Sequence, residues 1–97
     1  MDGKVKRSFV LEYELDILEK KIRINDRPEM LIKDFLKELK DSGDFLSKML
    51  YNDIIETALT EMRVMAWTGM DIKDWLSSVG YENGKEQKTE QNSQKFR

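Results

Sequence analysis

The clearest pattern of apolar positions lies between residues 26 and 43. Asp26 is followed three residues later by Glu29, which is the spacing of a capping box, and Pro28 suits the first turn of a helix. Gly43 suits the left-handed position just beyond a helix end. The apolar stripe between these signals consists of Leu31, Ile32, Phe35, Leu36 and Leu39. We therefore predict an amphipathic helix from about Asp26 to Gly43.

Two more helices are predicted after Gly43. From Asp44 to about Trp67, apolar residues recur at the helical period, and this stripe is wide enough to contact two neighbouring elements. Its members are Leu46, Leu50, Ile54, Ala58 and Met62. A shorter pattern begins at Asp71 and stops at Gly80. We place the longer helix at the centre of the fold and the shorter helix against it.

The segment from Ser8 to Ile24 fits two structures. An apolar seam of Leu11, Leu15, Leu18 and Ile22 has helical spacing, and Asp16–Lys20 and Glu19–Arg23 are charge pairs four residues apart. Residues 9–17 also alternate between apolar and polar positions, which is typical of a strand. The charge pairs favour a helix. A short strand over about residues 5–11 that leads into the helix stays open as the alternative.

These elements predict an all-α protein, a compact bundle of about four helices in one domain of 97 residues. Residues 1–7 form a basic N-terminal arm and residues 8–81 form the helical domain. Residues 82–97 contain a single apolar side chain, Phe96, and we predict a disordered tail there. Residues 8–81 carry fifteen acidic and ten basic residues, whereas the arm and the tail each have a small excess of positive charge.

Composition removes much catalytic chemistry. The chain has no cysteine and no histidine, so thiol chemistry, histidine-dependent triads and the usual zinc ligands are excluded. Its five glycines are isolated and form no phosphate-binding loop. The carboxylate pairs Asp53/Glu56 and Asp71/Asp74 fit a polar helix face and a first helical turn better than a metal site. We expect no enzyme activity, no cofactor and no metal, and a cytoplasmic location without membrane binding.

Binding to another protein is the function that this composition favours. Trp67, Met70 and Trp75 belong to an aromatic and methionine cluster of the kind found in protein interfaces, although the same residues also suit a core. The second candidate interface is the seam of Leu11, Leu15, Leu18 and Ile22. We predict a small regulator or adaptor that acts through protein–protein contact as a homodimer, with a partner protein whose identity the sequence does not give.

Nucleic-acid binding is the main alternative. If residues 4–41 formed a strand, a helix and a capped second helix, this order would resemble the ribbon-helix-helix DNA-binding regulators, which pair strands between two chains. The resemblance implies that Lys6, Arg7 and Ser8 contact DNA, with Lys6 and Ser8 on one strand face. The turn between that family's helices is replaced here by Asn25-Asp26-Arg27-Pro28. A further alternative is an acidic inhibitor of a nucleic-acid-binding protein.

Overall fold

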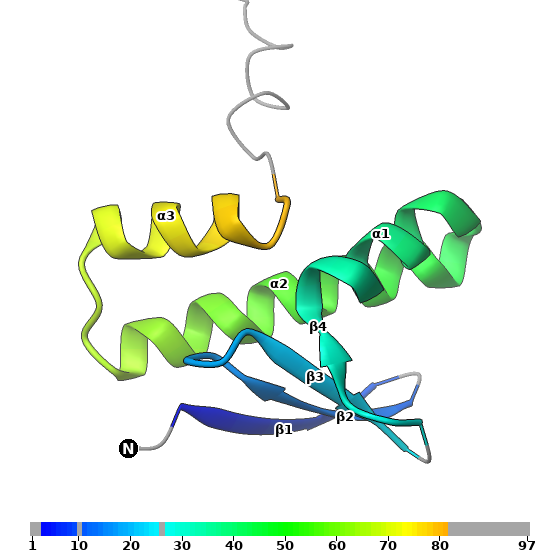
Figure 1. Ribbon diagram of the computed structural model, residues 1–97, viewed down its shortest axis with the longest axis horizontal. Helices are drawn as coiled ribbons and strands as arrows, with labels where there is room; N and C mark the ends of the chain where they lie inside the picture. Colours follow the sequence, from blue (N-terminus) through cyan, green and yellow to red (C-terminus); the bar gives the residue numbers. More distant parts are fainter. Residues whose placement is uncertain (1–2, 10, 26, 82–97) are drawn as a thin grey trace, which may run out of the picture.

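The protein is a two-layer α+β structure in which three helices cover one face of an antiparallel sheet (Figure 1). The computed structural model describes residues 3–9, 11–25 and 27–81. The four strands are neighbours in chain order, and they span Lys4–Ser8 (β1), Glu12–Asp16 (β2), Lys21–Ile24 (β3) and Met30–Leu31 (β4). The helices span Ile32–Ser42 (α1), Phe45–Val64 (α2) and Gly69–Ser78 (α3).

Strand β2 organises the sheet because its side chains alternate strictly between the two faces. Tyr13 and Leu15 point to the helices and are buried, and Ile17 just beyond the strand continues this row. Strand β1 pairs with one side of β2 and β3 pairs with the other. Ile22 lies opposite Leu15 in β3 and is also fully buried. Because side chains on a strand have a period of two, this burial fixes the register of all three strands.

The predicted all-α bundle is therefore wrong, and the error lies in residues 8–24. Leu15 and Ile22 belong to neighbouring strands instead of one helical seam. The charge pairs that favoured a helix are replaced by a cross-strand ion pair between Arg23 and Glu14. Between the strands, Lys20 has a φ of 59° in a tight turn, which a helix cannot contain. The alternation of residues 9–17 was the correct signal.

Helix α1 ends as predicted and starts later than predicted. Gly43 adopts a φ of 71°, and its N–H bonds to the carbonyl of Leu39, so the predicted C-terminal glycine is confirmed. The helix begins only at Ile32, because Met30 and Leu31 pair with β3 as the short edge strand β4. The predicted capping residue, Asp26, lies outside the described residues.

Helices α2 and α3 confirm the last two predicted helices within a few residues. Thr68 caps α3, because its side chain accepts a hydrogen bond from the N–H of Asp71 at 3.1 Å. None of the helices in the described part of the chain is sufficiently long and apolar to span a membrane. Residues Lys4 to Arg7 of the predicted arm belong to β1. The predicted disordered tail, residues 82–97, lies outside the described residues.

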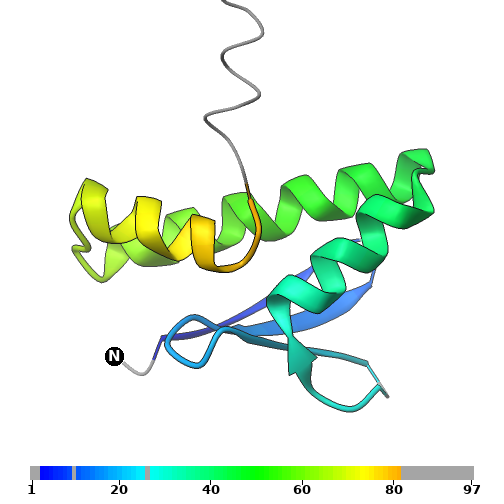
Figure 2. The same cartoon turned by 45° about the horizontal axis from the view of Figure 1, so that its top comes forward.

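Trp75 connects α3 to the sheet. Its indole N–H donates a 2.8 Å hydrogen bond to the backbone carbonyl of Ile17, in the turn between β2 and β3. Both residues are buried, so this carbonyl has no exposed surface on which water could replace the indole. Figure 2 shows α3 lying on the same side of the sheet as α1 and α2. The bond therefore fixes α3 on the end of the sheet where β2 turns into β3.

We predict that Trp75→Phe destabilises the fold by about 1–3 kcal/mol, because the Ile17 carbonyl loses its donor inside the protein. The free energy of unfolding in urea measures this change. Trp67→Phe is the matched control, since Trp67 is only partly buried. Equal destabilisation by the two variants would contradict the importance of the indole hydrogen bond.

Candidate functional site

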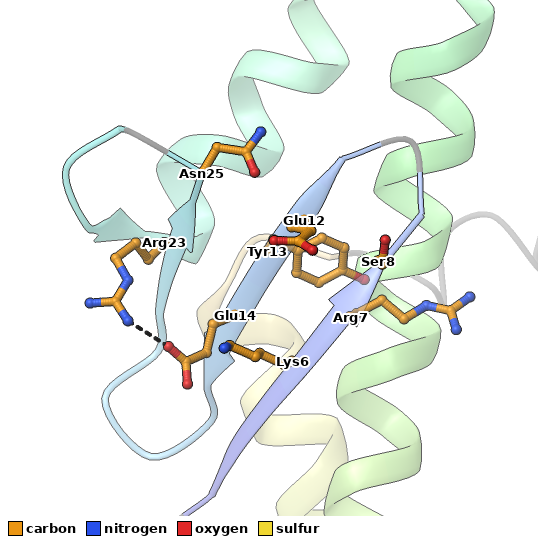
Figure 3. A pocket seen from close by; sticks show the side chains of 8 residues that line it. All are labelled: Lys6, Arg7, Ser8, Glu12, Tyr13, Glu14, Arg23 and Asn25. Carbon is orange, nitrogen blue, oxygen red and sulfur yellow. Dashed lines mark hydrogen bonds and ion pairs between the residues drawn. The ribbon is translucent and has the colours of Figure 1, made fainter.

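The sheet face that the helices leave open is polar over β1, β2 and β3, and Leu31 of β4, opposite Lys21, adds an apolar side chain at its edge. Figure 3 shows side chains from β1, β2 and β3 gathered over a shallow depression on this face. Those on the open side are Lys6, Ser8, Glu12, Glu14, Arg23 and Asn25. A sheet face of this composition is stable in contact with water.

Charges on the open face are arranged in rows that run across the strands. Lys6 lies opposite Glu14, which in turn lies opposite Arg23. Arg23 donates to the Glu14 carboxylate at 2.8 Å. The adjacent row repeats the order base, acid, base with Lys4, Asp16 and Lys21. The acids of β2 thus offset most of the basic charge, and this face lacks the concentrated basic patch expected of a nucleic-acid-binding surface.

Arg7 lies on the other face of β1 and joins the sheet to α2. Its guanidinium donates to the Asp53 carboxylate from Nη2 to Oδ1 at 2.6 Å and from Nε to Oδ2 at 3.0 Å, and Nε also lies 3.2 Å from Oδ1. Tyr13 donates its phenolic proton to Oδ2 of Asp53 at 2.6 Å. The Thr57 hydroxyl lies 3.1 Å from the phenolic oxygen and donates to it, because that proton is already engaged.

This cluster is suited to holding two layers together and unsuited to catalysis. The hydrogen bonds from Arg7 hold the pKa of Asp53 below its ordinary value, so the carboxylate stays ionised. Burial, with the hydrogen bond to Asp53, raises the pKa of Tyr13 well above its ordinary value, so the phenol stays protonated. Neither group is poised to exchange a proton near neutral pH. In the described part of the chain, no cluster of three or more potential metal ligands occurs.

An apolar groove lies between the sheet and the first two helices, and we call it the α1–α2 groove. Its volume is about 530 Å³. Its apolar lining consists of Leu11, Ile24, Phe35, Leu39, Leu46 and Leu50. Polar groups mark its rim: Arg27 stacks 5.8 Å from the Phe35 ring centre and forms a 3.2 Å ion pair with Glu38. An apolar floor with a polar rim is the composition of a protein-binding surface.

Two apolar side chains at the start of α2 are exposed, and one of them lines this groove. Leu46 in its wall is 53% exposed, and the preceding residue, Phe45, is 73% exposed. Exposure of a large aromatic ring is unfavourable in water, and aromatic residues are enriched in protein interfaces. The sequence contained the signal that Phe45 lies beside the main stripe of α2, but its exposure depended on how α1 and the sheet pack around that stripe.

The residues predicted as a protein interface are separated by the fold. Leu15, Ile22 and Trp75 are buried in the core. Of the others, Leu11 lines the α1–α2 groove, Leu18 is exposed in the β2–β3 turn, Trp67 is partly buried, and Met70 is 74% exposed at the start of α3. The predicted seam therefore does not form one continuous surface.

The residues predicted to contact DNA are divided between the two sheet faces. Lys6 and Ser8 share the open face, as the alternation predicted, whereas Arg7 points toward α2 and Asp53. The strand-helix-helix order is absent, because β2 and β3 occupy the place of the first helix. The structural basis for that resemblance is thereby removed.

Comparison of the chain with models of protein families, with curated proteins and with solved structures found no match.

We predict that stability falls at acid pH through Asp53. Its folded-state pKa lies below its ordinary value of 3.8, so its stabilising contribution is complete above that value and is lost as pH falls through the folded-state pKa. Asp53→Asn should lower stability at neutral pH and flatten the decline below pH 3.8. Urea unfolding at several pH values measures both effects, with Asp74→Asn on the exposed surface of α3 as control. An Asp53→Asn profile parallel to that of the unmodified protein would refute this assignment.

Proposed function

We propose that this protein is a non-enzymatic adaptor or regulator that acts through protein–protein contact as a homodimer. The observation that carries the proposal is the α1–α2 groove with Phe45 exposed beside it. Its floor is apolar, its rim carries a paired Arg27 and Glu38, and the neighbouring ring stands in solvent. These are the parts of an interface core and its rim.

A second copy of this chain suits the groove because the exposed Phe45 ring and the groove wall at Leu46 are neighbours in α2. A two-fold dimer requires a patch that is complementary to itself. Phe45 directly precedes Leu46, which forms part of the groove wall. We infer that in the dimer the exposed Phe45 ring of each chain covers the groove of the other.

The described surfaces do not favour an enzyme or a nucleic-acid-binding protein. The cluster of Asp53, Tyr13 and Arg7 is satisfied internally and holds β1 and β2 against α2. The open sheet face alternates in charge, so it offers little attraction to a nucleic-acid backbone. A protein surface is the ligand that the exposed apolar groups fit best.

We predict that Phe45→Asp raises the dimer dissociation constant about a hundredfold or more, because it places a charge in an apolar contact. Sedimentation equilibrium over a wide concentration range measures this constant. Val64→Asp is the matched control, since Val64 is also apolar, on α2 and 57% exposed, but at the opposite end of that helix. A monomer in the unmodified protein, or equal weakening by both variants, would overturn the proposed dimer.

A further inference from the structure

Strand β1 forms an open edge of the sheet. Within the described part of the chain it pairs only with β2, and the sheet order places it at one end. It is five residues long and contains neither proline nor acidic residues. An edge strand presents backbone N–H and C=O groups that can pair with another extended chain.

The hydrogen-bond pattern identifies which residues face this edge. The N–H of Ile17 donates to the carbonyl of Gly3 at 2.8 Å, so these two residues form a hydrogen-bonded pair across β1 and β2. In an antiparallel ladder such pairs alternate with non-bonded ones, and Val5 and Arg7 are therefore the next to bond to β2. The backbone groups of Lys6 and Ser8 consequently point outward, away from β2.

The side chains beside this edge select for charge. Lys6 begins a row whose order is base, acid, base, and the acid of that row, Glu14, is bonded to Arg23 at 2.8 Å. The ion pairs found among the described residues do not include Lys6. A strand added outside β1 would continue the alternation if it placed an acidic side chain opposite Lys6. Opposite charges at directly facing positions stabilise a strand pair, whereas like charges destabilise it.

We propose that β1 binds an acidic extended segment of a partner protein as a fifth strand of the sheet. The partner carries acidic residues at alternate positions, so that they share the open face with Lys6. A second copy of β1 does not fit, because the strand has only basic charges and antiparallel pairing centred on it sets Lys6 against Lys6. Edge lysines therefore discourage self-pairing while leaving the edge attractive to acidic strands.

This partner surface is distinct from the α1–α2 groove, which is lined by none of the β1 residues. The proposed dimer and the proposed acidic partner can therefore be tested separately. Phe45→Asp tests the groove, and variants in β1 test the edge.

The experiment uses two capped peptides in which valine alternates with either glutamate or lysine over the length of β1. Titration of the full chain, followed through backbone amide NMR shifts, should show binding of the glutamate peptide and none of the lysine peptide. The bound state should slow amide hydrogen exchange at Lys6 and Ser8, because their outward N–H groups become hydrogen-bonded. Equal binding of both peptides, no binding of either, or shifts confined to other elements would overturn the proposal.

Two variants separate charge from backbone pairing. Lys6→Glu should weaken the glutamate peptide about tenfold and favour the lysine peptide. Lys73→Glu on α3 makes the same change of net charge at an exposed position away from β1 and should leave binding unchanged. The Ser8 N–H points outward and is not bonded to β2. Ser8→Pro removes this donor and should weaken binding of the glutamate peptide, while thermal unfolding shows that the fold persists. Unchanged binding in both β1 variants would contradict the edge as the site, whereas loss of binding in Phe45→Asp would assign the peptide to the groove.

Discussion

Burial of the inward row of β2 is the constraint on which the structure depends. Tyr13, Leu15 and Ile17 lie under the helices with almost no exposed surface. Each makes a different contact: the Tyr13 hydroxyl donates to Asp53 of α2, Leu15 lies opposite Ile22 of β3, and the Ile17 carbonyl accepts a hydrogen bond from the Trp75 indole of α3. A shift of β2 by one residue would turn this row to solvent and bury three carboxylates instead. The register of the sheet and the position of two helices are thus set by the same strand.

The inward row also explains how the ionised carboxylate of Asp53 is tolerated between the sheet and α2. Its carboxylate would be costly to bury alone. Arg7 reaches it from the edge strand, with part of its side chain still in water, and Tyr13 supplies a neutral donor from the interior. The ion pair is bidentate, so it fixes direction as well as distance. The edge strand β1, which contributes only Val5 to the apolar packing, is thereby attached to α2 as well as to β2.

The later half of the chain could be predicted from its sequence and the first half could not. Gly43 and the wide stripe of α2 are local signals, and the structure follows them. Residues 8–24 contain two periodicities at once, and the four-residue spacing of Glu19 and Arg23 favoured the helix, which the structure does not form. Tertiary packing selects the strands, because β2 and β3 bury Leu15 together with Ile22 while the charged side chains of these two strands remain on the open face. The α1–α2 groove was beyond sequence reasoning for the same reason, since its walls come from separate elements whose packing depends on the sheet.

The two proposed binding surfaces are those that packing of the core leaves exposed and unpaired. A two-layer fold has one helix-covered face, one open face and two sheet edges, and only the covered face is satisfied by the core. Here the open face is neutralised by its own rows of alternating charge, and one edge is shortened to the two residues of β4. What remains is the β1 edge, basic and unpaired by any strand in the described part of the chain, and the groove beside Phe45, which is apolar. Surfaces of such different chemistry would bind different partners. A homodimer formed through the groove would carry two β1 edges, each able to bind an acidic segment. A partner with two such segments would therefore bind more tightly than a partner with one.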